Sequence, residues 1–387
     1  MSKADVWAPE WREYADETTS GHVVQLTDAP AWHAGAYFTA GTVATDNETL
    51  VFTSNRTGKM NLFRLSLATG EITQLTDVPE ETRCRPEWQY DGPHEMGVNR
   101  QPVLGARTRW VYYLVGQTLC SVHLDTLEER VHYELPAASK IACFHLNRAE
   151  TKLVMPYTEM AAFDIGPDEV PIGQRAVWRR IKAGSYMSGL LVFDIERDEM
   201  AVWHEEPGWF SHAQFCPTDN ELVLYCHEGN WEDEKERMWV YDHRAGTNRH
   251  LRPQQPNECI GHETWVGDTA RVLYHGWVGE RTLVGFINLD GTGKTDYFAS
   301  PHYYGHFASN GDGSLVVTDA GVTADMISLV DFPGDRMRFR PLCRHGTRWG
   351  DHLTHPHPHF TPDCKRVVFS ASHAPGQSQL FIADVEL

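Results

Sequence analysis

Short hydrophobic runs, each preceded by a polar turn, recur along the whole chain and limit its possible folds more than any other feature. The runs are rich in β-branched, aromatic and aliphatic residues, as short strands are. They are residues 50–53, 110–115, 153–157, 221–225, 271–274, 314–318 and 366–370. Their spacing is roughly 40 to 60 residues, and helical periodicity is almost absent.

Each unit continues with a further strand, a turn and another strand, as in residues 63–72 and 122–128. Several strands repeated at such a period are typical of a β-propeller blade. A chain of 387 residues exceeds the usual size of one hydrophobic core, so a closed architecture of about seven blades fits its length. The sequence therefore predicts an all-β, seven-bladed β-propeller in which residues 1–387 form a single domain.

A repeated strand near the N-terminus predicts how the ring closes. Residues 23–28 read Val-Val-Gln-Leu-Thr-Asp, and residues 72–77, which end the first complete blade, read Ile-Thr-Gln-Leu-Thr-Asp. The last unit stops at residues 381–385 without such a strand. Because native proteins cover unpaired strand edges, we expect the N-terminal strand to complete the last blade.

Charge and cysteine usage narrow the choice of partners and compartment. A net charge of -19 argues against nucleic acid as a partner, although a few arginines or a metal can make one pocket attract a small anion. No stretch of about 18 apolar residues occurs, and no apolar run follows the first lysine, so we expect neither membrane association nor export. The eight cysteines are scattered without a Cys-x-x-Cys pair, which indicates reduced thiols and a cytoplasmic location.

Four histidines lie close together near the C-terminus, at His352, His355, His357 and His359. Proline follows both His355 and His357, which favours an extended backbone in which alternate side chains point the same way. Imidazole is the commonest metal ligand among side chains. The run therefore predicts a metal site, and a surface or capping cluster at the start of a strand is the alternative.

Aligning the repeats by turn and strand places one histidine from each of four blades at the same register, namely His212, His262, His306 and His357. The innermost strand of a blade lines the central channel, so we expect these side chains to face its mouth. Each of them could instead be a core histidine that is hydrogen-bonded to a carbonyl group.

The preferred metal ligands are His306, His355 and His357, with His352 as a possible fourth, for an ion of Mn, Fe, Ni or Zn. His359 lies farther along its strand and is predicted to be structural. Arg237 follows an acidic run and precedes a strand, so it is either a solvated loop charge or a residue at the top of the channel near His227 and Glu228.

Together these motifs resemble the oligogalacturonate lyase family, cytosolic enzymes of pectin breakdown that are built on a seven-bladed β-propeller. The matching segments in chain order are Cys226-His227-Glu228-Gly229, Arg237-Met238-Trp239, His262-Glu263-Thr264-Trp265, His306-Phe307, Cys343-Arg344-His345 and Thr354-His355-Pro356-His357-Pro358. The N-terminal half matches more loosely, through the Gln-Leu-Thr-Asp strand and residues 124–129.

The resemblance implies a lyase that cleaves oligogalacturonides or related oligouronides by β-elimination and gives 4,5-unsaturated uronates. It implies a manganese-type ion, Mn²⁺ or another divalent transition metal, held by His306, His355 and His357. The family has a glutamine as the fourth ligand, where this chain has His352.

The resemblance also assigns roles outside the metal site. His262 aligns with the catalytic base of the family, and Arg237 aligns with the arginine beside that base. We further expect His212 and His227 to bind the substrate.

Two other classes of function stay open at this point. A non-catalytic propeller, similar to TolB-like or peptidase-associated propellers, would bind proteins or peptides and would need no convergent histidines. A metal-dependent lyase or hydrolase could act on a different uronate at the same histidines. No Gly-x-Ser-x-Gly, phosphate-binding Gly-rich loop or His-Glu-x-x-His occurs, so serine hydrolase, nucleotide and zincin activities lack support.

Overall fold

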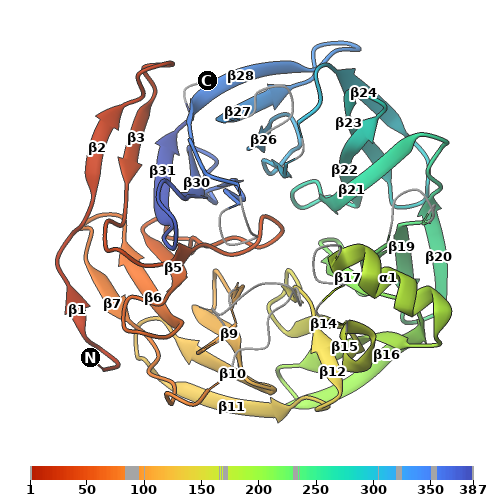
Figure 1. Cartoon of the computed structure of the whole chain (residues 1–387), viewed down its shortest axis with the longest axis horizontal. Helices are drawn as coiled ribbons and strands as arrows, with labels where there is room; N and C mark the ends of the chain where they lie inside the picture. The colour runs from red at the N-terminus through yellow and green to blue at the C-terminus, as the bar shows by residue number, and fades with distance from the viewer. Residues whose placement is uncertain are drawn as a thin grey trace. The chain divides into compact units, whose positions relative to one another are not determined.

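The computed structural model describes residues 2–82, 96–99, 101–164, 166, 168, 173–229, 234, 236–303, 305–319, 325–349 and 355–385. Within these residues the strands form seven β-sheets of four or five strands each (Figure 1). The sheets are the blades of a β-propeller, so the predicted all-β, seven-bladed fold is confirmed.

The first three sheets use the N-terminal half of the chain. The first has the order β1 (Val6–Trp7), β7 (Ile72–Gln74), β6 (Asn61–Ser66), β5 (Thr49–Ser54), β4 (His33–Ala34). The second is β11 (Glu129–Glu134), β10 (Thr118–His123), β9 (Trp110–Val115), β8 (Val103–Leu104). The third is β12 (Ser139–Ile141), β14 (Lys152–Glu159), β15 (Met187–Asp194), β16 (Glu199–Pro207), with β13 (His145–Leu146) also paired to β14.

Three further sheets each use four consecutive strands. They are β17 (Phe210–Cys216), β18 (Asp219–His227), β19 (Met238–Asp242), β20 (Thr247–Arg252); then β21 (Glu258–Trp265), β22 (Arg271–Val278), β23 (Arg281–Asn288), β24 (Thr295–Ala299); and β25 (Phe307–Ser309), β26 (Val316–Thr318), β27 (Met326–Asp331), β28 (Arg338–Arg344). Consecutive strands pair because most of their connections are short, as in the antiparallel pair of β22 and β23, which Gly279 and Glu280 join.

The seventh sheet joins the two ends of the chain. Its order is β2 (Arg12–Ala15), β3 (His22–Gln25), β31 (Gln379–Asp384), β30 (Arg366–Ala371), β29 (His359–Phe360). In the antiparallel pair of β3 and β31, Val23 lies opposite Ala383 and Gln25 opposite Phe381. The N-terminal strand therefore completes the last blade, as the repeated Gln-Leu-Thr-Asp segment predicts.

All seven hydrophobic runs of the sequence form the second strand of a blade, and the run at 110–115 coincides with β9. Two helical segments were not predicted, because helical periodicity is almost absent from the sequence. Between β14 and β15 the chain forms a 3₁₀ helix (Met160–Phe163) and the helix α1 (Gly173–Ala183). Val177 and Ile181 of α1 pack against Phe163 and Trp209, so tertiary packing stabilises a helix that is only three turns long.

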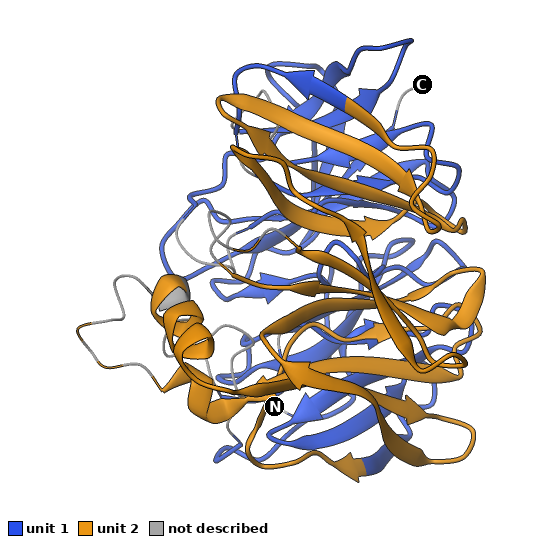
Figure 2. Ribbon diagram, turned by 90° about the vertical axis from the view of Figure 1, so that its right-hand side faces the viewer, with its two compact units in different colours: residues 1–84, 91–132, 297–387 blue, residues 85–90, 133–296 orange. Residues whose placement is uncertain are grey.

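By the density of its internal contacts the chain divides into two compact units (Figure 2). Unit 1 comprises residues 1–84, 91–132 and 297–387, and unit 2 comprises residues 85–90 and 133–296. The prediction that residues 1–387 form a single domain stays a prediction, because this division does not show whether either unit folds alone.

Each unit has its own hydrophobic cores, formed by the inward-facing residues of adjacent strands. In unit 1, Phe52 and Phe63 stack beside Val368 and Ile382. In unit 2, one core gathers the strands from β14 to β19, and another gathers β18 to β23.

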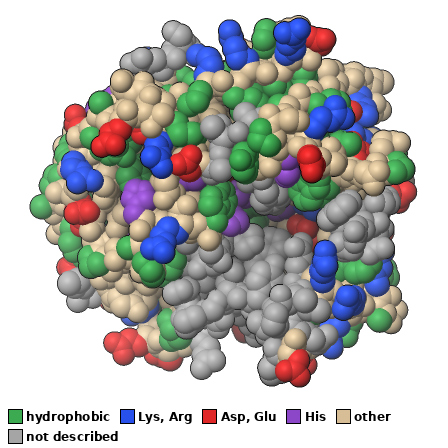
Figure 3. Space-filling model, turned by 45° about the horizontal axis from the view of Figure 1, so that its top comes forward, with side chains coloured by type: hydrophobic (Ala, Val, Ile, Leu, Met, Phe, Trp, Pro, Cys, Tyr) green, Lys and Arg blue, Asp and Glu red, His purple; other side chains and the backbone are tan. Residues whose placement is uncertain are grey.

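The surface charges and the helices relate to the prediction that neither nucleic acid nor a membrane is a partner. On the face drawn in Figure 3, acidic and basic side chains are interspersed with hydrophobic ones. In the described part of the chain, the helical segments are too short or too polar to cross a bilayer. The expected absence of nucleic-acid and membrane partners stays a prediction.

A buried histidine in unit 1 predicts a loss of stability in acid. His33 is fully buried at the start of β4, and its Nε2 lies 3.2 Å from the carbonyl oxygen of Ala29. Burial, and then the charge of Arg56, lower the pKa of His33 from 6.5 to about 3. Below pH 6.5, His33 therefore becomes protonated in the unfolded chain but stays neutral in the folded chain. Protonation favours the unfolded state, so the free energy of unfolding falls as the pH falls.

Between pH 6.5 and 4 this one group accounts for about 3 kcal/mol. Unfolding monitored at pH 7 and at pH 4 checks the value, with His33→Asn as the comparison because its side chain does not titrate. The variant is expected to lose less stability on acidification than the wild-type protein. Equal losses in the two proteins would exclude His33 as the cause.

Candidate active site

Three of the predicted metal ligands come together in unit 1. His306 directly precedes β25, and His355 and His357 lie just before β29. One possible ligand atom from each of the three side chains lies within 4.8 Å of the others. The ring centroids are 4.3 Å apart for His306 and His357 and 5.4 Å apart for His306 and His355. Three imidazoles this close are a donor set that suits a divalent transition metal.

Asp319, which follows β26, orients this cluster. Its carboxylate accepts hydrogen bonds from the backbone N–H of His306 at 2.6 Å, from Nδ1 of His306 at 2.9 Å and from the backbone N–H of His357 at 3.3 Å. Burial by itself would raise the pKa of Asp319, but the contacts with His306 hold it below its ordinary value. With its Nδ1–H donated to Asp319, His306 keeps Nε2 as the ligand atom, which is the usual arrangement behind a metal-binding histidine.

The sequence analysis missed Asp319. An aspartate at the end of a strand, as in Val317-Thr318-Asp319, is the only signal that could have indicated it, and strand ends with an aspartate are common in this chain. The pairing of β25 with β26 places the Asp319 side chain beside His306, and this pairing cannot be seen in the sequence around Asp319.

Aromatic rings surround the three histidines. The ring of Tyr37 lies 4.9 Å from that of His357, Phe38 lies 5.3 Å from His306, and Trp349 lies 4.9 Å from His355. His306 and His357 are buried and His355 is half-buried. Such an apolar shell limits access of water and strengthens electrostatic interactions at the site.

The predicted extended backbone through the histidine run is wrong at one residue. His357 has a φ of 47°, in the left-handed region, although Pro356 and Pro358 flank it. The hydrogen bond from its N–H to Asp319 and the packing on Tyr37 hold this uncommon conformation. His355 and His357 therefore meet through a local turn of the backbone.

His359 is buried and lies 2.6 Å from Thr42 Oγ1 and 3.2 Å from the carbonyl oxygen of His357, so these contacts give it a structural role. His352 lies outside the described residues, and its assignment as the fourth ligand stays a prediction.

Replacing Asp319 by asparagine is expected to weaken metal binding about 10- to 100-fold. The amide keeps the size of the side chain but cannot hold Nδ1–H of His306 as a carboxylate does. Titration of the metal-free protein with Mn²⁺ by calorimetry measures the effect. Asp331→Asn, which removes an exposed ion pair with Arg338 in the same unit, is the control. An unchanged affinity in Asp319→Asn would contradict the orienting role.

The remaining predicted site residues lie in unit 2. His212 is in β17 and His262 is in β21, and each strand is the first of its sheet. Both side chains are buried, and their ring centroids are 5.3 Å apart. Two of the four histidines that the repeat alignment places at one register therefore meet here, while His306 and His357 meet in unit 1.

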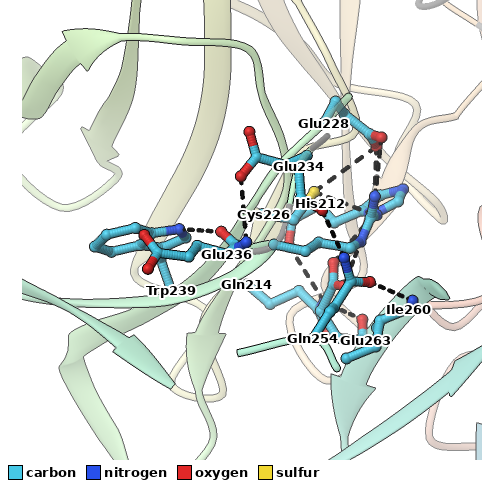
Figure 4. Close-up of polar contacts among 11 residues, drawn as sticks. His212, Gln214, Cys226, Glu228, Glu234, Glu236, Trp239, Gln254, Ile260 and Glu263 are labelled. Carbon is cyan, nitrogen blue, oxygen red and sulfur yellow. Dashed lines mark hydrogen bonds and ion pairs between the residues drawn. The ribbon is translucent and has the colours of Figure 1, made fainter. Parts of the chain in front are cut away.

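Arg237 is buried among charged groups, so the alternative of a solvated loop charge is wrong. Its Nε donates to Glu263 at 2.9 Å, its Nη1 donates to Glu228 at 3.0 Å, and its Nη2 lies 3.0 Å from Nδ1 of His212. Figure 4 draws these contacts, with His212, Glu228 and Glu263 labelled. Burial would raise the pKa of Glu263, but the Arg237 guanidinium more than offsets this and lowers it to about 2.

His212, Cys226 and Glu228 form a second group with the spacing of a metal site. One observation argues against a metal there: the Arg237 guanidinium already supplies a positive charge next to Glu228 and His212. This group is therefore an ion-pair network.

His227, at the end of β18, lies among polar and aromatic groups. Its Nε2 lies 3.0 Å from Glu206 Oε1, its ring stacks on Trp239 with centroids 5.1 Å apart, and Phe210 and Tyr225 contact the ring as well. Unlike His212, it is only half-buried.

Known proteins resemble this chain over its full length. A family model described as oligogalacturonate lyase matches residues 1–386. The oligogalacturonate lyase of Dickeya dadantii (strain 3937) is 25% identical over 407 residues, which cover 100% of this chain and 98% of that protein.

Two solved structures are similar in fold as well as in sequence. An oligogalacturonate lyase in complex with manganese has a TM-score of 0.84 and 25% sequence identity, and the match covers 100% of this chain and 99% of that one. An oligogalacturonate lyase from Vibrio parahaemolyticus has a TM-score of 0.83, with 25% identity and the same coverage.

Fold and site together define a seven-bladed β-propeller with a buried histidine cluster suited to a metal ion. The chain belongs to the oligogalacturonate lyase family. It is therefore an enzyme of the carbon–oxygen lyase class, and the alternative of a non-catalytic binding propeller is wrong.

Proposed function

We propose that this enzyme cleaves short oligogalacturonides by metal-assisted β-elimination and releases 4,5-unsaturated uronates. The observation that carries the proposal is the group of three converging imidazoles, one of which is oriented by a buried carboxylate. The family match over residues 1–386 and the manganese in a solved relative support the same activity.

The donor set fits the metal that the proposal requires. His306, His355 and His357 would hold Mn²⁺ or another divalent transition metal, and His352 is the proposed fourth ligand. When bound, the ion supplies positive charge that stabilises the negative charge developing on a uronate carboxylate. The imidazoles and Asp319 fix where that charge is placed.

His262 is the proposed base. It accepts the proton from C5 of the uronate, which is acidified by the adjacent carboxylate group. The electron pair of the C5–H bond then forms the double bond between C4 and C5, and the bond from C4 to the glycosidic oxygen breaks. A neutral histidine suits this step because its ordinary pKa lies near neutral pH.

The other residues of unit 2 take supporting roles in the proposal. Arg237 contributes a fixed positive charge toward the substrate carboxylate or the departing oxygen. His212 and His227 bind the substrate, and the half-buried ring of His227 stacked on Trp239 is suited to packing against a sugar.

We also propose that the enzyme acts in the cytoplasm. None of the seven described cysteines is joined in a disulfide to another of them, and six of the seven are buried. Reduced, buried thiols are usual in a reducing compartment.

Ultraviolet absorbance of the unsaturated product tests the proposal. Purified enzyme is mixed with short oligogalacturonides as isolated, after chelation, and after readdition of Mn²⁺. Absorbance that rises, stops on chelation and returns with Mn²⁺ is the expected result. Product formation that is unaffected by complete metal removal would overturn the metal-assisted mechanism. No product despite bound metal would overturn oligogalacturonide as the substrate.

A further inference from the structure

The network around Arg237 contains two buried glutamates to which the proposed reaction gives no role. Glu228 and Glu263 both contact the Arg237 guanidinium, and both are almost completely excluded from solvent. Burying two carboxylates beside one guanidinium is costly unless the geometry is tightly satisfied.

Glu263 is the residue that links the parts of this network. Its Oε2 accepts a hydrogen bond from Nε of Arg237 at 2.9 Å, and its Oε1 lies 3.2 Å from Nδ1 of His212. Its backbone carbonyl accepts a hydrogen bond from Nε2 of Gln214 at 3.0 Å, and Thr264 Oγ1 donates to Oε1 of the same glutamine. Glu263, in β21, therefore links His212 of β17 to Arg237, which directly precedes β19 (Figure 4).

The position of Glu263 in β21 connects the Arg237 network to the proposed base, His262. It directly follows His262 in β21, and the two residues lie opposite Tyr274 and His275 of β22, just after a β-bulge between Ile260 and His262. Successive side chains of a strand point to opposite faces. His262 and Glu263 share one peptide bond, so a shift of the Glu263 backbone also moves His262, while the Glu263 carboxylate holds Arg237 and His212.

We propose that Glu263 is a positioning residue of this lyase, which fixes Arg237 and His212 in one arrangement relative to the strand that carries His262. The inference rests on the proposed function, because the roles of Arg237 and His262 belong to it. Glu263 itself does not touch the substrate. Its effect is on kcat, since misplacing catalytic groups by about 1 Å lowers rates by roughly 100-fold.

The chain offers a closely matched control on the same strand. Glu258, at the start of β21, is also buried and forms a two-point ion pair with Arg252 at 3.0 and 2.5 Å. This pair touches neither Arg237 nor His212. Glu258→Gln therefore removes the charge from an equally buried glutamate–arginine pair without disturbing the network.

The decisive experiment compares Glu263→Gln with Glu258→Gln in the unsaturated-product assay, alongside thermal unfolding and metal analysis. Glutamine keeps the shape of the side chain but removes the charge that holds Arg237. We expect Glu263→Gln to lower kcat about 100-fold, with a much smaller change in KM and full metal content. Glu258→Gln is expected to lower the unfolding midpoint by about as much as Glu263→Gln does, but to keep the wild-type kcat.

Glu263→Asp is the second variant, and it keeps the inference testable if the glutamine variant does not fold. It retains the charge and shortens the reach, so we expect stability near that of the wild type and a kcat reduced about 10-fold. Wild-type kcat in folded Glu263→Gln or Glu263→Asp, or equal losses of kcat in Glu263→Gln and Glu258→Gln, would overturn the positioning role. A wild-type enzyme that forms no unsaturated product would instead overturn the proposed function, and this inference with it.

Discussion

Replacing His262 with alanine is expected to lower kcat by roughly 10²- to 10⁴-fold, the contribution that a positioned general base makes. The C5 proton of a uronate leaves slowly unless a base is held next to it, and water is a poor substitute. His262 lies in β21, buried and packed against the rings of His212 and His275. The unsaturated-product assay at saturating substrate measures the loss.

Metal content and unfolding midpoint separate this result from a structural defect. The metal ligands lie in unit 1 and His262 in unit 2, so His262→Ala is expected to retain its metal. His243→Ala is the control, because that histidine is exposed in unit 2, where it stacks on Trp203 and makes a tilted contact with Tyr241. Turnover within a few-fold of wild type in His262→Ala would reject His262 as the base.

Replacing His306 with alanine is expected to abolish stoichiometric metal binding and, with it, turnover. Two imidazoles remain, and the Asp319 carboxylate loses the ring that it orients. The loss of affinity is expected to exceed the about 10- to 100-fold typical of removing an outer hydrogen-bond partner. Metal analysis of the purified protein, followed by activity at rising Mn²⁺ concentration, measures both quantities.

Excess metal distinguishes a weakened site from an irrelevant one. Partial recovery of activity at high Mn²⁺ is expected for His306→Ala, because His355 and His357 still converge. His22→Ala, which removes an exposed ion pair with Asp384 in the same unit, is expected to match the wild type. Full metal content in His306→Ala would show that the cluster is not the metal centre.

Much of the fold is readable from sequence because the signals are local. The run at 110–115 and strand β9 coincide, and the repeat of Gln-Leu-Thr-Asp predicts the pairing of β3 with β31. Alternation of side chains and turn residues act over a few positions, so they survive without knowledge of the partner strand. Helix α1 was missed because its three turns depend on packing against Phe163 and Trp209.

The sequence predicted the histidines of the candidate site but not its acidic residues. His306 and His357 stand out by residue type and by the register of the repeat, and His355 stands out by its place in the histidine–proline run. No comparable sequence signal singles out Asp319 or Glu263, because aspartates and glutamates are frequent at turns and strand ends of this chain.

The sequence by itself determined the number of blades, the closing strand and the histidines that can hold a metal, because strand periodicity, repetition and residue type are properties of neighbouring positions. Only the tertiary structure decided the tautomer of His306, the left-handed turn at His357 and the burial of Arg237 between Glu228 and Glu263. Those features depend on hydrogen bonds between side chains from different strands. Their partners are set by how the strands pair and pack, which no local pattern encodes.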